Sequence, residues 1–198
     1  MKRIEVSYGP MSKWLRNAWL APAIVTGTWA APAPAPDPAA TGPAIAWFAG
    51  GVDAAFARAR AEHKPLFLYW GASWCPPCNQ VKATLFKRLD FIERSSQFIP
   101  VYVDGDQPNG QELGDRFRVR GYPTMILFSS DGSEITRLPG EIDPQQYLQV
   151  LSLGLGTGRS AHATLATALG PGAASLTSED WTLLANYAWD TDEGYCRT

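Results

Sequence analysis

Two cysteines separated by two residues are the side chains of this sequence most suited to chemistry. Residues 74–78 read Trp-Cys-Pro-Pro-Cys, and residues 121–124 read Gly-Tyr-Pro-Thr. Two intervening residues place the sulfurs of Cys75 and Cys78 about one helical turn apart, within bonding reach of each other. The pair could therefore alternate between dithiol and disulfide and exchange electrons with disulfides of other molecules.

A structural zinc site is the inorganic alternative for such a pair. It requires four ligands, commonly two pairs of cysteines. The remaining candidates are Cys196, His63 and His162, and none of them has pair spacing. We therefore expect no metal site, with His63 at the C-terminus of a helix and His162 exposed to solvent. We also expect no cofactor, because two sulfurs carry both electrons.

Length and composition suit one compact domain with additional segments. The chain has 198 residues, of which 45% are apolar, and its formal charge is −2. This leaves room for a domain of about 110 residues and creates no basic field for nucleic acid. Three cysteines argue against a fold held by several disulfides. Cys196 is then either an inert terminal thiol or a partner in a mixed disulfide.

The N-terminal residues predict export. Residues 1–30, with a possible start at Met11, combine a positively charged stretch, a short apolar run and a small-x-small cleavage site. The apolar run is too short and too interrupted to span a bilayer comfortably. A disordered tail is the alternative. Residues 31–44 form a Pro/Ala tract, which predicts a semi-extended linker. Export into a bacterial periplasm would place the cysteines where disulfides occur.

Helix and strand patterns alternate through residues 45–153, the predicted domain. A continuous apolar run at residues 66–71 is typical of a strand buried on both faces. The expected order is helix 53–63 with Asp53 as its N-cap, strand 66–71, helix 76–89, strand 98–103 interrupted by Pro100, helix 109–117, strands 124–128 and 134–138, and helix 144–153 capped by Asp143. This order predicts a mixed α/β sheet with helices on both faces.

Residues 154–198 are expected to form a helical C-terminal extension after a glycine-rich stretch ends the domain. Two short helices are predicted, at residues 161–169 and 179–189. A Thr177-x-x-Asp180 capping box precedes the second helix. Its predicted apolar stripe consists of Trp181, Leu184, Ala185 and Ala188. We expect this stripe to pack on the main domain.

Residues 52–153 resemble the thioredoxin superfamily. The resemblance lies in WCPPC, in YVDGD after the second strand, in GYPT, in the SSDGSE hairpin and in Gly140. The residues around the cysteines look most like periplasmic thioredoxin-like proteins of the disulfide-reductase group. The resemblance implies a thioredoxin fold.

In that fold Cys75 would lie just ahead of a helix and act as the nucleophile. Unpaired N–H groups and the helix dipole would stabilise its thiolate and lower its pKa. Cys78 would be buried and would resolve the mixed disulfide, so the pair forms the redox-active disulfide. Pro76 and Pro77 stiffen the loop, and they also remove two N–H donors from the thiolate. We therefore expect a reducing couple.

Three further residues are assigned to substrate binding by the same resemblance. Pro123 is similar to the family's cis-proline, which would expose the backbone of Tyr122 to an extended substrate segment. The Tyr122 side chain would tune substrate choice. Trp74 is similar to the family's tryptophan beside the first cysteine, and we expect it to shield the site.

One departure concerns proton transfer to Cys78. Many thioredoxins have a buried carboxylate six residues before the first cysteine, and here that position is Tyr69. The lysine that often accompanies it corresponds to Pro100. Water or another group would then have to accept the proton, and Glu93 and Asp104 are candidates by charge only.

The sequence thus predicts an exported thiol–disulfide oxidoreductase that reduces protein disulfides. Its expected partners are disulfide-containing proteins and a protein electron donor, which could be membrane-bound, and we expect a monomer. Two alternatives stay open. One is a disulfide oxidase or isomerase, which would use the same residues. The other is a redox-inactive binding or chaperone module, whose partner surface would be the C-terminal 45 residues with Trp181, Trp189 and Cys196.

Overall fold

The computed structural model describes residues 43–140 and 143–192. The predicted signal peptide, most of the predicted linker and Cys196 lie outside the described residues. The predicted boundaries between signal, linker, domain and extension stay predictions.

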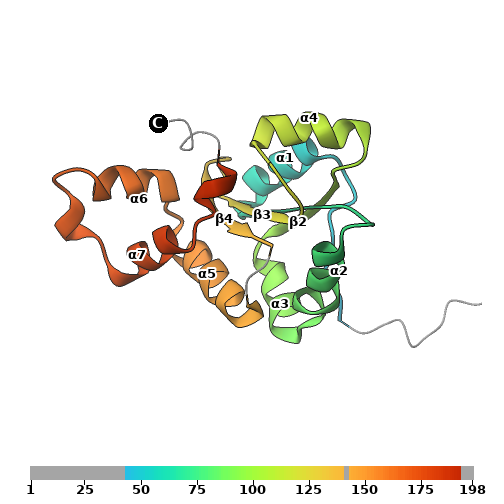
Figure 1. The fold of residues 1–198 in the computed structure, drawn as a ribbon, viewed down its shortest axis with the longest axis horizontal. Coiled ribbons are helices and arrows are strands. Elements are labelled where there is room, and N and C mark those ends of the chain that lie inside the picture. The colour runs from blue at the N-terminus through green and yellow to red at the C-terminus, as the bar shows by residue number, and fades with distance from the viewer. Residues whose placement is uncertain (1–42, 141–142, 193–198) are drawn as a thin grey trace, which may run out of the picture. The chain divides into compact units, whose positions relative to one another are not determined.

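A four-stranded mixed sheet forms the centre of the molecule (Figure 1). Its strands are β1 (Leu66–Gly71), β2 (Ile99–Asp104), β3 (Thr124–Phe128) and β4 (Glu134–Pro139), in the spatial order β2-β1-β3-β4. β1 runs parallel to β2 and antiparallel to β3, and β3 runs antiparallel to β4. The predicted mixed sheet is confirmed.

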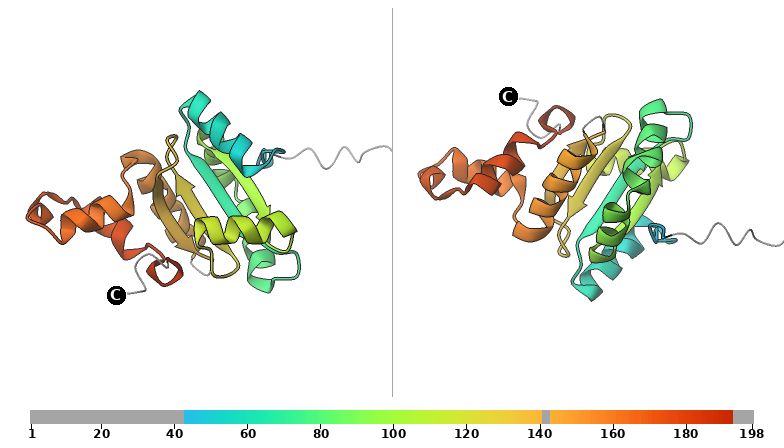
Figure 2. Two further views of the ribbon diagram at one scale, coloured as in Figure 1. Left: turned by 90° about the horizontal axis from the view of Figure 1, so that it is seen from above. Right: turned by 90° about the horizontal axis from the view of Figure 1, so that it is seen from below.

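Helices cover both faces of this sheet, as Figures 1 and 2 show. The helices are α1 (Val52–Glu62), α2 (Pro76–Ala83), α3 (Leu89–Arg94), α4 (Pro108–Phe117), α5 (Pro144–Thr157), α6 (Ala161–Ala168) and α7 (Ser178–Ala185). Short 3-10 turns occur at Leu85–Lys87, Ser95–Gln97, Ala173–Ser175 and Trp189–Thr191. One face carries α2, α3 and α5, and the other carries α1 and α4.

The central strand β1 explains why its sequence is apolar throughout. Phe67 and Tyr69 point into the core formed with α2, α3 and α5. Leu66, Leu68 and Trp70 point into the core formed with α1 and α4. Every residue of β1 is buried, as expected for a strand with neighbours on both edges and helices on both faces.

The helix predicted for residues 76–89 is shorter in the structure. α2 ends at Ala83, and Thr84 turns its hydroxyl back to the Gln80 carbonyl, 2.8 Å away. A 3-10 turn then buries Leu85 and Phe86 in the core. The chain re-enters a helix only at α3, which the sequence analysis missed.

Two predicted ends were also wrong. Gly51, not Asp53, is the N-cap of α1, and Asp53 lies in the first helical turn, where it pairs with Arg116. α5 continues through Gly154 to Thr157. A Cβ at position 154 would lie 3.0 Å from the Leu127 side chain, so glycine lets the helix pack closely on β3. The Asp143 N-cap is confirmed.

Pro100 does not interrupt the second strand. β2 lies at the edge of the sheet, where a missing N–H costs no ladder hydrogen bond with a further strand. On that open side the Pro100 carbonyl accepts the Phe48 N–H at 2.8 Å.

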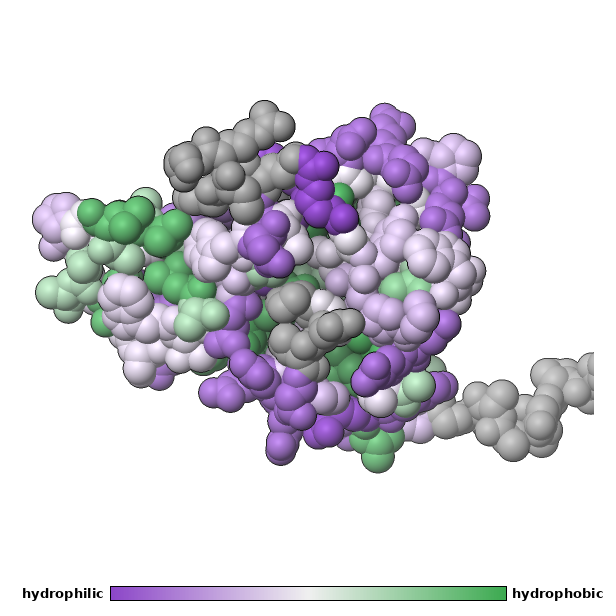
Figure 3. Space-filling view, viewed as in Figure 1, coloured by the Kyte–Doolittle hydropathy of each residue, from purple (hydrophilic) through white to green (hydrophobic). Residues whose placement is uncertain are grey.

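The apolar stripe predicted in the C-terminal extension is buried only in part. The Thr177–Asp180 capping box is present, and Leu184 and Ala188 are buried, but Trp181 and Ala185 are exposed. Leu183 and Tyr187 are buried in their place. α7 ends at Ala185, so Ala188 leaves the helical face and donates its N–H to the Arg137 carbonyl of β4 at 2.9 Å. Hydrophobic surface remains exposed on the extension (Figure 3), where Leu169 is 80% exposed.

The two histidines differ from each other in their surroundings. His63 caps the C-terminus of α1 in the left-handed conformation, as predicted for a helix end. His162 was predicted to be solvent-exposed, which is wrong. Its Nε2 lies 2.9 Å from both the Asp192 carboxylate and the Tyr187 hydroxyl.

Within the described ranges, no helix has the length and hydrophobicity needed to cross a membrane.

Candidate functional site

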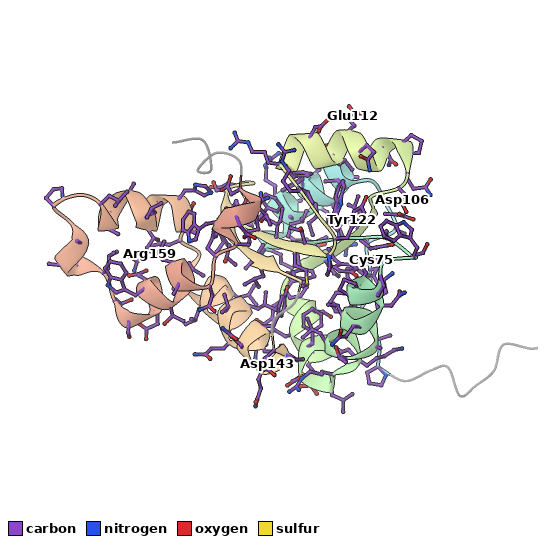
Figure 4. All side chains as sticks on the ribbon, in the orientation of Figure 1. Cys75, Asp106, Glu112, Tyr122, Asp143 and Arg159 are labelled. Carbon is purple, nitrogen blue, oxygen red and sulfur yellow. A yellow bond between two sulfur atoms is a disulfide. The ribbon has the colours of Figure 1, made fainter. Side chains whose placement is uncertain are left out.

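Cys75 and Cys78 form a disulfide. Cys75 lies at the start of α2 (Figure 4). Their Cα atoms are 5.2 Å apart, and both residues are buried. They lie just beyond the C-terminal end of β1, with Ala72 packed against them and Tyr122 alongside. The cysteine pair therefore lies at the C-terminal end of a central strand of the sheet.

The Cys75 sulfur caps the N-terminus of α2. It accepts the Cys78 N–H at 3.2 Å, as an N-cap side chain does. Pro76 and Pro77 occupy the first helical positions, where a missing N–H breaks no intrahelical bond. A thiolate at this sulfur would thus receive one backbone N–H and the positive end of the helix dipole.

Aromatic side chains form the rim of the site. Trp74 is 65% exposed, so its ring projects into solvent, and the expectation that it shields the cysteines stays a prediction. Its indole N–H donates to the Asp106 carboxylate, and its ring meets the Tyr122 ring edge-on at 5.9 Å. Tyr122 also stacks on Trp70, with the ring centroids 6.4 Å apart. These contacts hold an exposed indole in one orientation next to the disulfide.

The Tyr122–Pro123 peptide bond is cis. It directly precedes β3, and Pro123 is buried. Thr124 donates its hydroxyl to the Gly121 carbonyl at 2.8 Å, which closes the turn. Gly140, just after β4, lies against the Pro123 ring, and a Cβ at that position would overlap the ring. The segment after β4 thus meets the cis-proline that precedes β3.

Tyr69 lies beneath the cysteine pair. Only 1% of it is exposed, and its hydroxyl donates to the Cys78 carbonyl at 3.3 Å. Burial, together with the neighbouring Tyr102, holds the pKa of Tyr69 well above its usual range. A neutral hydroxyl therefore occupies the region where the resemblance implies a carboxylate.

The two acidic candidates for proton transfer make no hydrogen bond or ion pair to the cysteines in the described part of the chain. Asp104 accepts the Asp106 N–H at 3.1 Å in the turn after β2. Glu93 lies on α3. Across the described ranges, no group of three or more His, Cys, Asp and Glu side chains could hold a metal ion.

Three rim residues escaped the sequence analysis. Asp106 anchors Trp74, and Gln111 donates to the Tyr122 hydroxyl at 3.4 Å. Gly105 makes room for the Tyr122 ring, which a Cβ would overlap. The YVDGD motif contained two of these residues, but no local pattern connects that turn with Trp74 or Tyr122.

Comparisons with known proteins agree with this geometry. Residues 52–154 match the family model of the thioredoxin-like domain. The thiol:disulfide interchange protein DsbD of Pseudomonas fluorescens is 33% identical over 95 residues, which are 46% of this chain and 16% of that protein. The chain therefore spans less than a fifth of the length of this curated relative.

Two solved structures are similar in fold. A putative disulphide-isomerase from Bacteroides thetaiotaomicron superposes with a TM-score of 0.51 at 29% identity, covering 60% of this chain and 98% of that one. A thioredoxin from Thermus thermophilus superposes with a TM-score of 0.50 at 28% identity, covering 60% of this chain and 96% of that one. The chain belongs to the thioredoxin-like domain family, and within that domain its Cys75–Cys78 disulfide lies at the start of α2.

Proposed function

We propose that this protein is an exported disulfide reductase that transfers two electrons from Cys75 and Cys78 to disulfides of other proteins. The observation that supports this most directly is the position of the Cys75 sulfur. It caps α2 and receives the Cys78 N–H at 3.2 Å, an arrangement that stabilises a thiolate.

The same position favours a reducing couple. A disulfide is strongly oxidising when its dithiol form is stabilised by a thiolate of very low pKa. Here Pro76 and Pro77 offer no N–H, and no histidine stands between the cysteines. The Cys75 thiolate then has one backbone N–H and the helix dipole as its stabilising partners. We expect a moderately stabilised thiolate and hence a low reduction potential.

The reaction proceeds in two exchanges. The Cys75 thiolate attacks one sulfur of the substrate disulfide, and the other sulfur leaves with the electron pair and takes a proton from water. Cys78 then loses its proton and attacks the Cys75 sulfur. The second substrate sulfur leaves and is protonated, and the Cys75–Cys78 disulfide remains. A dithiol protein must afterwards return two electrons and two protons.

Substrate docking is assigned to the exposed rim. Trp74 offers an apolar surface in solvent, while Tyr122 packs against the buried disulfide and is followed by the cis-proline Pro123. An extended segment flanking a substrate cysteine would lie across these residues. We place the protein in the bacterial periplasm on the basis of its predicted signal, and its relatives named as thiol:disulfide interchange proteins support a protein donor.

The reduction potential of the Cys75–Cys78 couple tests this proposal. It is measured by equilibration with glutathione or dithiothreitol followed by thiol trapping, in the Cys196→Ser background. A potential near about −270 mV supports a reductase. A potential between about −180 and −120 mV would make the protein an oxidase or isomerase instead.

A second measurement separates an enzyme from a binding module. In the reductase, Cys78→Ser is expected to accumulate a mixed disulfide between Cys75 and a protein substrate, and Cys75→Ser is expected to form none. A disulfide that resists mild reductant in the folded protein would favour the redox-inactive module.

A further inference from the structure

The tyrosine beneath the cysteine pair is connected to the resolving cysteine. The Tyr69 hydroxyl donates to the Cys78 carbonyl at 3.3 Å across nine residues of sequence. In the part of the chain that the structure describes, the hydrogen bonds made by Cys78 beyond the α2 backbone ladder are this one and its N–H bond to the Cys75 sulfur. One contact orients Cys78 from below, and the other connects it to its redox partner.

The Tyr69 ring is held rigidly, which makes its hydroxyl a fixed point. It stacks on Tyr102 with centroids 5.5 Å apart and meets Phe86 edge-on at 4.8 Å. The space around the hydroxyl is kept open by Gly71, since a Cβ there would lie 2.9 Å from the hydroxyl oxygen. A buried aromatic ring has little freedom to move away from such a contact.

We propose that Tyr69 is a positioning residue for the second exchange, in which Cys78 attacks Cys75. This inference rests on the proposed function and extends it. The hydroxyl ties the first turn of α2 to the end of β1, so that the Cys78 sulfur stays in line with the Cys75 sulfur when their bond is open. Reacting atoms must be held about 3–3.5 Å apart for efficient attack, and small displacements are costly.

The first exchange depends on different contacts. Attack by Cys75 on an external disulfide is governed by its position at the helix N-terminus and by the Cys78 N–H. The Tyr69 hydroxyl makes no hydrogen bond to Cys75. Loss of the hydroxyl should therefore slow the second exchange while leaving the first nearly unchanged.

Reaction of the reduced protein with oxidised glutathione separates the two exchanges. Formation of the Cys75–glutathione mixed disulfide depends on glutathione concentration, and its closure by Cys78 does not. Acid quenching and mass spectrometry follow both species, in the Cys196→Ser background. Tyr69→Phe should slow closure about tenfold, the effect of losing one hydrogen bond, and change the first exchange by less than about twofold.

Two further variants sharpen the test. Tyr102→Phe removes a neighbouring phenol hydroxyl for which no hydrogen bond to either cysteine is found in the described residues, and both exchanges should keep their rates. Gly71→Ala keeps every phenol but displaces the Tyr69 hydroxyl, and it should slow closure as Tyr69→Phe does. It also provides the test should Tyr69→Phe fail to fold, as judged by thermal unfolding.

The dependence on pH separates positioning by the Tyr69 hydroxyl from proton transfer through it. Because the pKa of Tyr69 is raised by burial and by Tyr102, the hydroxyl stays protonated, and the closure ratio of wild type to Tyr69→Phe should be constant between about pH 6 and pH 9. Closure at the wild-type rate in Tyr69→Phe, or an equal loss in both exchanges, overturns the inference. Because the probe is glutathione, failure to reduce protein disulfides would overturn the proposed function alone.

Discussion

Gly140 lies so close to Pro123 that a methyl group at position 140 would overlap the proline ring. Gly140 directly follows β4, and Pro123 directly precedes β3. A side chain at position 140 would therefore shift the segment on which we expect the substrate to dock.

We predict that Gly140→Ala lowers the rate of reduction of a protein disulfide by at least about tenfold, because small displacements at a docking site are costly. Its reaction with oxidised glutathione should change little, since that reaction needs only the sulfurs. Stopped-flow kinetics with both substrates measure the two rates. Gly156→Ala is the matched control, because its Cβ would meet nothing within 4 Å. Equal losses with both substrates would contradict a docking role.

Trp74 and Asp106 provide a second prediction. The indole N–H donates to the Asp106 carboxylate while the ring is 65% exposed. Asp106→Ala should free the indole and raise the KM for a protein disulfide about threefold, with kcat nearly unchanged, because the loss of one exposed hydrogen bond is modest. Asp106→Asn keeps an acceptor oxygen and should resemble the wild type. Steady-state kinetics distinguish the two variants, and a fall in kcat alone would argue against a binding effect.

Tyr147 and Tyr187 are expected to respond in opposite ways to the loss of a hydroxyl. The Tyr147 hydroxyl is buried without a hydrogen-bond partner among the described residues. The Tyr187 hydroxyl lies 2.7 Å from the Glu134 carboxylate and 2.8 Å from the Asp192 carboxylate. Tyr147→Phe should stabilise the protein by about 1 kcal/mol, and Tyr187→Phe should destabilise it by about 2 kcal/mol. Urea unfolding at neutral pH measures both.

Alkaline pH should destabilise the protein through its buried tyrosines. Burial raises the pKa of Tyr69, Tyr147 and Tyr187 above its ordinary value near 10. Above about pH 10 the unfolded chain releases these protons while the folded protein keeps them, so stability is constant below that pH and falls above it. Each group contributes about 1.4 kcal/mol per pH unit. Urea unfolding between about pH 8 and pH 11 should show a shallower decline in Tyr147→Phe.

The buried Arg137 should stabilise the packing of the C-terminal extension. It is 2% exposed, and its guanidinium donates to both oxygens of Glu134 and to the carbonyls of Phe117 and Arg118. It also donates to the Thr191 carbonyl of the extension at 3.3 Å. Arg137→Met leaves these acceptors without their donor, and it should cost about 3 kcal/mol of unfolding free energy. Arg58→Met removes an exposed ion pair with Glu62 and should cost less than about 1 kcal/mol. Similar losses in both variants would contradict the role of burial.

The local patterns of the sequence determined the chemistry and the order of elements. A cysteine pair after a fully apolar run indicated a helix start at the end of a central strand, and Cys75 does cap α2 behind β1. Such patterns can be read because they record periodicity and capping between residues close in sequence. They failed at Thr84, where packing of Leu85 and Phe86 ended the helix early, and at Trp181, which is exposed while Leu183 of α7 is buried.

Only the tertiary structure decided which distant side chains surround the cysteines. The sheet order β2-β1-β3-β4 brings the turn after β2 to Trp74 and the end of β4 to Pro123. Tyr69 contacts Cys78 because the strand and the helix cross at one point. These contacts depend on strand register and on the packing of helices against the sheet, and no spacing within a single segment encodes either of them.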